Sequence, residues 1–226
     1  MKITVISGSP KPGGFINDSL ELVASHLERR GADVTKIRLS EKHIDDCIGC
    51  FTCLRTGECV IHDDVGGIID IMKNSDGFVI GSPVRNALIT ACLKRFIERI
   101  TYILGFTQAL EDKYSLGIAS VGLFGGKSVS RRFCCLQDVF HTHLSGFVFC
   151  SVGIPISRGI SDKKHKLTSA ADKLVRDISE KTPRSRREKL SLAIDKTIVR
   201  KFMLERKPDL YASVIRAWQL KGYISS

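Results

Sequence analysis

Short apolar, β-branched runs alternate with amphipathic helical patterns along most of this chain. The predicted strands are apolar nearly throughout, as in GFVIGSP at 77–83 and YSLGIASVG at 114–122. Strands of this kind, alternating with helices, are typical of a parallel sheet whose two faces are both covered. The pattern therefore predicts a doubly wound parallel sheet with strands at 2–6, 33–39, 77–83, 114–122 and 147–153.

Helical apolar spacing occupies the segments between these strands. The first helix is predicted at 17–31, with Asn17 or Asp18 as its N-cap and Gly31 as its stop. The strand–helix alternation fits a flavodoxin-like sheet of order 2-1-3-4-5, in which ligands bind at the carboxyl ends of the strands. The other helices are predicted at 63–75, 87–104, 128–144 and 169–181.

Residues 183–226 exceed this scheme and form a predicted basic helical extension to a domain of residues 1–182. Two helical stretches are separated by Lys207-Pro208, and the first carries an apolar stripe. The stripe is predicted either to pack on the domain or to serve as a dimerisation or partner-docking arm. Its members are Leu190, Ile194, Ile198 and Phe202.

The formal charge of +11 is concentrated near the C-terminus, where residues 161–226 hold 17 Lys and Arg but 8 Asp and Glu. Such an excess is either a solvated helix face or an attraction for acidic partners or nucleic acid. No run of about 18 apolar residues is present, so no membrane span is predicted. The N-terminal apolar run is too short for a signal peptide, so we expect a cytoplasmic protein.

Four cysteines fall within CIGCFTCLRTGEC at 47–59, inside a predicted insertion at 43–62 that follows the second strand. Clustered cysteines in a reducing compartment bind metal or do redox chemistry more often than they form disulfides. The C-x2-C-x2-C run resembles the cysteine spacing of ferredoxin clusters and favours a [4Fe–4S] cluster. Zinc and redox-active thiols stay open as alternatives, because both also use closely spaced cysteines.

The segment ISGSPKPGGFINDS joins the first strand to the first helix and lacks both common nucleotide fingerprints. Its hydroxyls, an amide and free backbone N–H groups can surround one phosphate, although an ordinary strand-to-helix turn is the alternative. The predicted phosphate-binding residues are Ser7, Ser9, Lys11, Asn17 and Ser19.

Two further loops follow the third and fourth strands. GSPVRNALITACLKRFIER resembles the second cofactor loop of flavin reductases in the flavodoxin superfamily, with Arg85 where that family has tyrosine and Glu98 where it has aspartate. An arginine there can stabilise reduced flavin or bind an anionic substrate. The predicted flavin-binding residues of these loops are Ser82, Pro83, Val84, Arg85, Asn86, Gly125 and Gly126.

Taken together, SGSP, the cysteine motif, the following VIHDDV and SPV…LKRFIER resemble the iron–sulfur flavoproteins of archaea and anaerobic bacteria. The resemblance covers roughly residues 1–160. It implies FMN, a homodimer or homotetramer, and a cluster that approaches the flavin of a neighbouring subunit. It also implies that the cluster is a [4Fe–4S] group held by Cys47, Cys50, Cys53 and Cys59.

We therefore expect an FMN- and [4Fe–4S]-dependent oxidoreductase that passes electrons between a one-electron carrier, such as ferredoxin or another acidic redox protein, and a two-electron acceptor or donor. One alternative is an FMN-dependent reductase or dehydrogenase of a small metabolite or quinone, with NAD(P)H as a substrate. Another is a non-catalytic redox sensor with a nucleic-acid-binding tail, but no DNA-reading motif is present and nucleic acid is not the expected partner. No side chain is assigned as a general acid or base.

Overall fold

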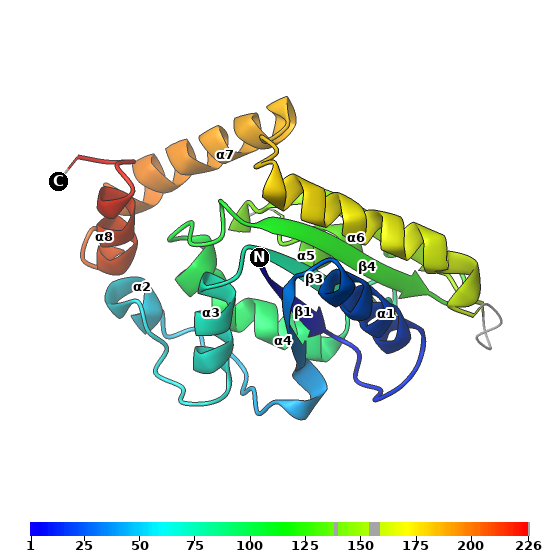
Figure 1. Cartoon of the computed structure of the whole chain (residues 1–226). Coiled ribbons are helices and arrows are strands. Elements are labelled where there is room, and N and C mark those ends of the chain that lie inside the picture. Colours follow the sequence, from blue (N-terminus) through cyan, green and yellow to red (C-terminus); the bar gives the residue numbers. More distant parts are fainter. Residues whose placement is uncertain (138–139, 154–158, 226) are drawn as a thin grey trace.

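The computed structural model describes residues 1–137, 140–153 and 159–225, and a five-stranded parallel sheet lies at its centre (Figure 1). The strand order β2-β1-β3-β4-β5 confirms the predicted order 2-1-3-4-5. β1 lies between β2 and β3, and its Ile6 is paired with Ile37 on one side and Ile80 on the other. The strands are β1 Lys2–Ser7, β2 Asp33–Arg38, β3 Gly77–Pro83, β4 Tyr114–Val121 and β5 His143–Ser151.

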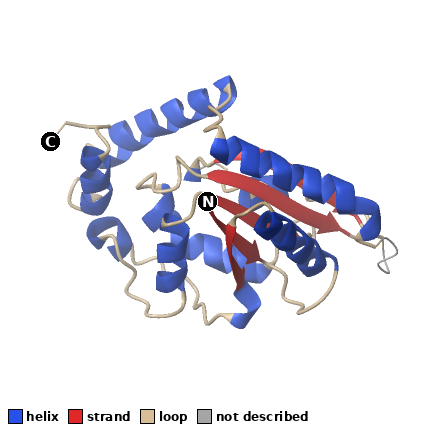
Figure 2. Cartoon of the chain, viewed as in Figure 1, coloured by secondary structure: helices blue, strands red, loops and turns tan. Residues whose placement is uncertain are grey.

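Helices cover both faces of the sheet, and their apolar sides form two separate cores (Figure 2). α1 and α6 pack together on one face, whereas α3, α4 and α5 contribute to the core on the other. The predicted doubly wound architecture is therefore confirmed. The helices are α1 Phe15–Arg29, α2 Thr52–Thr56, α3 Val65–Lys73, α4 Ala91–Ile100, α5 Lys127–Cys134, α6 Lys164–Ser179, α7 Arg186–Val199 and α8 Ala212–Leu220.

The five helices predicted for the domain all begin one to five residues away from their predicted starts, with α3 at Val65, α5 at Lys127 and α6 at Lys164. α1 starts at Phe15 after Gly14, so neither Asn17 nor Asp18 is its N-cap. The Asn17 amide instead reaches back to the first loop, where it donates to the Lys11 carbonyl. The predicted N-cap was wrong because asparagine near a helix start usually caps the helix, whereas the side chain of Asn17 is used here to bond the preceding loop.

The predicted helix at 87–104 is shorter at both ends. Asn86 and Ala87 have positive φ angles of 47° and 60°, which helical residues do not adopt. α4 therefore begins at Ala91, and Thr90 caps it by accepting from the Leu93 N–H. After Ile100 the chain continues as a π-helical turn over Thr101–Gly105.

The predicted helix at 128–144 was also too long, because α5 ends at Cys134 and β5 begins at His143. Leu136 and His141 have φ angles of 44° and 50°, which stop the helix and turn the chain back to the sheet. Residues 138–139 of this predicted helix lie outside the described part of the chain.

The C-terminal extension crosses the molecule and returns to the cysteine segment. Figure 1 shows α7 leading from the end of α6 to α8, which lies beside α2. Leu54 of α2 forms a buried apolar cluster with Leu204, Val214 and Trp218. The two predicted helical stretches are confirmed, and the second of them packs on the domain.

The apolar stripe of α7 points to solvent in this structure. Leu190, Ile194 and Ile198 are all exposed, whereas the side chain of Phe202 lies outside the described part of the chain. The docking role of this stripe and the division at residue 182 therefore stay predictions. Across the described ranges, no helix combines the length and apolar character that a bilayer crossing requires.

We expect Trp218→Ala to lower the free energy of unfolding by about 3–5 kcal/mol, because it empties a fully buried aromatic site. The Trp218 ring is 1% exposed, and its indole N–H donates to the Phe106 carbonyl at 2.8 Å. Urea denaturation measures the change, and Leu220→Ala on the same helix is the control. Leu220 is 91% exposed, so its substitution should change stability by no more than ~0.5 kcal/mol. Equal effects of the two variants would contradict the packing of α8 against the domain.

Candidate functional site

The loops after β1, β3 and β4 meet at the carboxyl edge of the sheet. The Gly8 N–H donates to the Gly81 carbonyl at 2.8 Å, and the Thr90 hydroxyl donates to the Gly8 carbonyl. The Val84 N–H donates to the Ser120 carbonyl at 2.7 Å. Segments that are distant in sequence are thus joined where open α/β sheets bind ligands.

The first loop is held together by its own polar side chains. Ser7 donates from Oγ to Asn17 Oδ1 at 2.6 Å, and the Ser9 N–H donates to Ser7 Oγ at 3.2 Å. Lys11 is exposed at the same loop. Ser19 lies apart from them, because it is buried in α1 and its hydroxyl donates to the Phe15 carbonyl.

The N-terminus of α1 has no side-chain cap among the described residues. Its first backbone N–H groups therefore lack partners within the helix and carry the positive end of the helix dipole. Such a terminus is suited to a phosphate, so this loop fits the phosphate of FMN.

The second and third loops contact each other. A Cβ on Gly126 would lie 2.5 Å from Val84 Cγ1 and 3.0 Å from the Ala87 carbonyl oxygen. Ser82 is buried, Pro83 and Val84 are half-buried, and Arg85 and Asn86 are exposed. Gly125 and Gly126 both have positive φ angles, 91° and 71°. The close approach of these loops fits a flat ring held by backbone groups, as FMN requires.

The four cysteines of the motif line one pocket. Cys47 and Cys50 are exposed, whereas Cys53 and Cys59 are half-buried. The short helix α2 carries Cys53 and is bounded by Phe51 and Gly57, both with positive φ. This tight path lets all four cysteines line the same pocket although they lie within thirteen residues of chain.

The electrostatics of this pocket favour a cationic occupant. Burial, together with the negative charge of the other three thiols, raises the pKa of Cys53 to about 11. The backbone N–H and hydroxyl of Thr52 lower the pKa of Cys50. Four thiolates at this position would need positive charge, which a bound metal ion or an iron–sulfur cluster would supply. Within the described ranges no three His, Cys, Asp or Glu side chains are placed to hold one metal ion, so the ligand set is inferred from the shared pocket.

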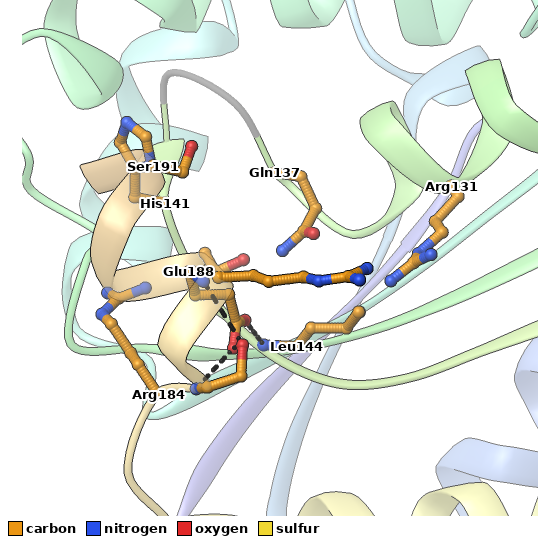
Figure 3. A pocket seen from close by; sticks show the side chains of 10 residues that line it. Arg131, Gln137, His141, Leu144, Arg184, Glu188 and Ser191 are labelled. Atoms are coloured by element: carbon orange, nitrogen blue, oxygen red, sulfur yellow. Dashed lines mark hydrogen bonds between the residues drawn. The ribbon is translucent and has the colours of Figure 1, made fainter. Parts of the chain in front are cut away.

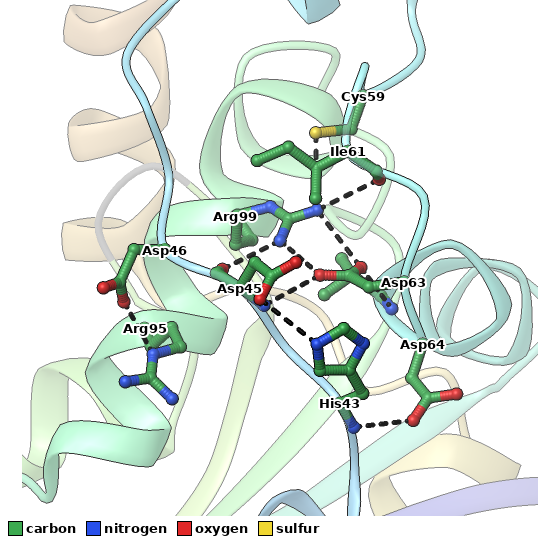
Figure 4. A network of polar contacts seen from close by, with 10 residues as sticks. His43, Asp45, Asp46, Cys59, Ile61, Asp63, Asp64, Arg95 and Arg99 are labelled. Carbon is green, nitrogen blue, oxygen red and sulfur yellow. Dashed lines mark hydrogen bonds and ion pairs between the residues drawn. The ribbon is translucent and has the colours of Figure 1, made fainter.

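A buried ion pair holds the cysteine segment against α4 (Figure 4). Arg99 donates to both carboxylate oxygens of Asp63, at 2.5 and 3.2 Å, and both side chains are fully buried. The same guanidinium donates to the Asp45 and Ile61 carbonyls, at 2.8 and 3.3 Å. It also lies 3.4 Å from the sulfur of Cys59. One side chain thus fixes both ends of the segment and donates to a predicted ligand.

Asp63 completes the network from its own side. Its carboxylate accepts the N–H groups of Asp45 and Val65, at 2.9 and 3.0 Å. Burial would raise the pKa of Asp63, but the bonds from Arg99 and from these two N–H groups outweigh it and lower that pKa below its usual 3.8. The carboxylate is therefore ionised at neutral pH.

α8 supports the cysteine segment from the opposite side. The Ser213 hydroxyl lies 3.1 Å from the Cys53 carbonyl and 2.8 Å from the Leu54 carbonyl. Arg216 donates to the Arg55 carbonyl at 3.3 Å. The Cys53 carbonyl also accepts the Gly57 N–H at 2.9 Å, whereas Leu54 and Arg55 lie in the last turn of α2, where carbonyl groups lack partners within the helix.

Several of these positioning residues were not assigned a role from the sequence. In the sequence, Arg99 belongs to a motif that resembles a flavin loop, and Asp63 stands at a predicted helix start. The residues around Thr90 and Ser213 in the sequence indicate at most a helix cap at each position. The partners of Thr90 and Ser213 lie 82 and 160 residues away, so only the folded chain identifies them.

The five-stranded fold and the three loops that meet at its carboxyl edge are those of the flavodoxin-like class, and the family match below identifies a flavin-dependent oxidoreductase. The sequence profile of the family described as NADPH-dependent FMN reductase matches residues 1–148. An iron–sulfur flavoprotein of Archaeoglobus fulgidus is 38% identical over 50% of this chain, which spans about half of that relative's length (51%). The chain belongs to the FMN reductase family and, within it, to the iron–sulfur flavoproteins.

Two more proteins resemble this chain over greater shares of their length. An iron–sulfur flavoprotein of Clostridioides difficile is 29% identical over 99% of this chain and 100% of its own length. The second is the NADH:FMN oxidoreductase EmoB, whose crystal structure is of the apo form. The structural match covers 76% of this chain and 87% of the EmoB chain. Its TM-score is 0.54 and its identity 22%, so this similarity supports the fold alone.

We expect Arg99→Met to lower the free energy of unfolding by about 3–5 kcal/mol at pH 7, because Asp63 would become a buried charge without a partner. Because the pKa of Asp63 is below 3.8 in the intact protein, the ion pair contributes at neutral pH and its contribution is lost as the pH falls through that lowered value. The difference between the two proteins should therefore shrink in acid. Urea denaturation at several pH values measures both effects.

Arg95→Met is the matched control for this experiment. Arg95 lies on the same helix and pairs with Asp46 at 2.6 Å, but the two side chains are 44% and 80% exposed. An exposed pair of this kind contributes at most ~1 kcal/mol. If Arg99→Met were no more harmful than Arg95→Met, the central role of the buried pair would be wrong.

We expect Gly126→Ala to weaken FMN binding, because the new methyl group meets Val84 and forces the two ring loops apart. A non-glycine residue at positive φ also costs about 1–2 kcal/mol. If the loop relaxes this strain only when flavin is absent, the strain opposes binding and raises the dissociation constant of FMN about tenfold. Quenching of FMN fluorescence measures that constant. Gly67→Ala is the control, since a Cβ there meets no atom within 4 Å; an unchanged FMN affinity in Gly126→Ala would contradict the assigned loops.

Proposed function

We propose that this protein passes electrons between a one-electron carrier and a two-electron acceptor or donor, using FMN and a [4Fe–4S] cluster. The observation that carries the proposal is the single pocket lined by Cys47, Cys50, Cys53 and Cys59. FMN exchanges two electrons and an iron–sulfur cluster one, so the pair supplies conversion between the two kinds of carrier.

The side chains around the pocket prepare it for this role. Arg99 places a buried positive charge 3.4 Å from the sulfur of Cys59, where its N–H would also donate to that sulfur as a cluster ligand. Tyr102 and Phe51 pack edge to face with ring centroids 5.4 Å apart, and both line the pocket. Aromatic cover and a nearby cation are features that tune the potential of a cluster through solvent exclusion and charge.

The α4 helix connects the two cofactor regions. Thr90 at its start is bonded to the flavin loop, and Arg99 near its end is bonded to the cysteine segment. A rigid element therefore sets the separation of the proposed cofactors within one chain. Ferredoxin or another acidic redox protein is the proposed one-electron partner, in keeping with the net charge of +11.

A second candidate function uses NAD(P)H directly to reduce a small metabolite or quinone. The observation that favours it is Arg85, which is exposed at the flavin edge and has no side-chain partner within the described ranges. A guanidinium in this position can bind the phosphate or carboxylate of a substrate.

We expect the anaerobically purified protein to contain about four iron atoms and four sulfide ions per chain together with FMN. Cys53→Ala should lose the iron and sulfide but keep FMN, because the flavin loops lie on other segments. Metal, sulfide and flavin analysis with an absorbance spectrum measures these contents. Cys150→Ala, which changes a buried cysteine in β5, is the control and should keep both groups.

Two results would contradict the proposal. Zinc without sulfide in the parent protein would exclude the cluster, and loss of FMN from Cys53→Ala would mean that the two sites are not separate. The same variants separate the two candidate functions. NADPH oxidation that survives in Cys53→Ala would favour the direct reductase over the electron-transfer role.

A further inference from the structure

A cavity of about 400 Å³ lies away from both cofactor regions, where the C-terminal extension meets the sheet. One wall comes from α5 and the segment leading into β5, and the other from the start of α7. Figure 3 shows Arg131 and Gln137 on one side of the cavity and Glu188 and Ser191 on the other. A volume of this size is typical of small-molecule sites.

Three arginines line the cavity, namely Arg131, Arg184 and Arg187. Neither Arg131 nor Arg187 has a side-chain partner in the part of the chain that the structure describes. Arg184 donates to the Glu111 carbonyl, and partial burial lowers its pKa. Guanidinium groups keep their charge when they lose water, so the cavity wall is cationic.

Glu188 is the single carboxylate of the cavity lining, and it offsets one of the three arginine charges and leaves two without compensation in the lining. Glu188 Oε2 accepts the N–H and hydroxyl of Ser185, at 2.9 and 2.7 Å, and Oε1 accepts the Leu144 N–H at 3.1 Å. These bonds occupy both carboxylate oxygens. The ring of His141, which also lines the cavity, faces Asp195 of α7, with 3.2 Å between Nε2 and Oδ2.

The α7 helix adds to the positive potential. Its capping box involves only Ser185 and Glu188, so the backbone N–H groups of Arg186 and Arg187 lack helical partners. Helix α7 is 14 residues long and carries the positive end of its dipole at this terminus. Two side-chain charges without carboxylate partners, a third arginine and this terminus therefore share one cavity.

The geometry points to a second, previously unassigned binding site in this cavity, for a small phosphate-bearing metabolite with a charge near −2. Arginine forks match phosphate oxygens in bidentate pairs, and the hydroxyls of Thr142 and Ser191 add neutral donors to the lining. The cavity is half open to solvent, with Arg131 and Arg187 exposed in its wall, and its volume suits a compact phosphate ester or diphosphate.

This site is distinct from the flavin site. Leu144 lines the cavity at the beginning of β5, whereas the flavin loops lie beyond its carboxyl end at Ser151. Seven residues of strand separate these ends by about 23 Å. A ligand in the cavity therefore cannot exchange electrons by contact with the flavin, and it acts by joining α5 and β5 to the extension.

Isothermal titration of inorganic pyrophosphate into FMN-loaded protein at low ionic strength tests the proposal. The flavin must be present because its own phosphate then occupies the α1 loop. We expect saturable binding that Arg131→Gln and Arg187→Gln each weaken about tenfold, the loss typical of a charged hydrogen bond. Arg186→Gln is the matched control: the neighbouring arginine on the same helix is exposed, does not line the cavity and should leave the affinity unchanged.

Limited trypsin digestion provides a second readout. The Arg184–Ser185 bond lies in the cavity wall, so pyrophosphate should slow its cleavage in the parent protein and in Arg186→Gln, but not in Arg187→Gln. Absence of saturable binding to the parent protein would overturn the proposal. An equal loss of affinity in Arg186→Gln and Arg187→Gln would also overturn it, because it would show attraction to net charge and not to this cavity.

Discussion

The buried ion pair of Arg99 and Asp63 is the interaction on which the cysteine segment depends. Removing two charges from water costs several kcal/mol per ion, and only multiple well-placed bonds offset that cost. Here the carboxylate accepts from two backbone N–H groups as well as from the guanidinium, and the guanidinium also reaches two carbonyls and one sulfur. The pair therefore organises a loop that has little regular structure of its own.

The same helix relates this loop to the flavin region. Thr90 and Arg99 are nine residues apart on one stretch of chain, which corresponds to about 14 Å along an α-helix. Each is bonded to a different functional loop, so neither loop can move far without the other. A flavodoxin-like sheet thus gains the proposed second redox site without a new domain, through one inserted loop that is anchored to an existing helix.

The strand order could be predicted from local patterns, because apolar strands are properties of short segments; the cysteine spacing likewise indicated a metal site, which stays a prediction. Helix boundaries were less accessible, since positive φ at Asn86, Ala87 and Leu136 comes from contacts made elsewhere in the fold. Arg99 could not be distinguished in the sequence from exposed Arg95 on the same helix. Nor could the docking of α8 be predicted, because a serine in a helix does not indicate which distant carbonyl it will meet.

The contact between Ser213 and the Cys53 carbonyl spans 160 residues. During synthesis the cysteine segment leaves the ribosome long before α8 exists. Until then the Leu54 carbonyl has no Ser213 hydroxyl to accept from, and the Leu54 side chain lacks Val214 and Trp218 as apolar partners. The final path of this segment therefore depends on residues that are translated last.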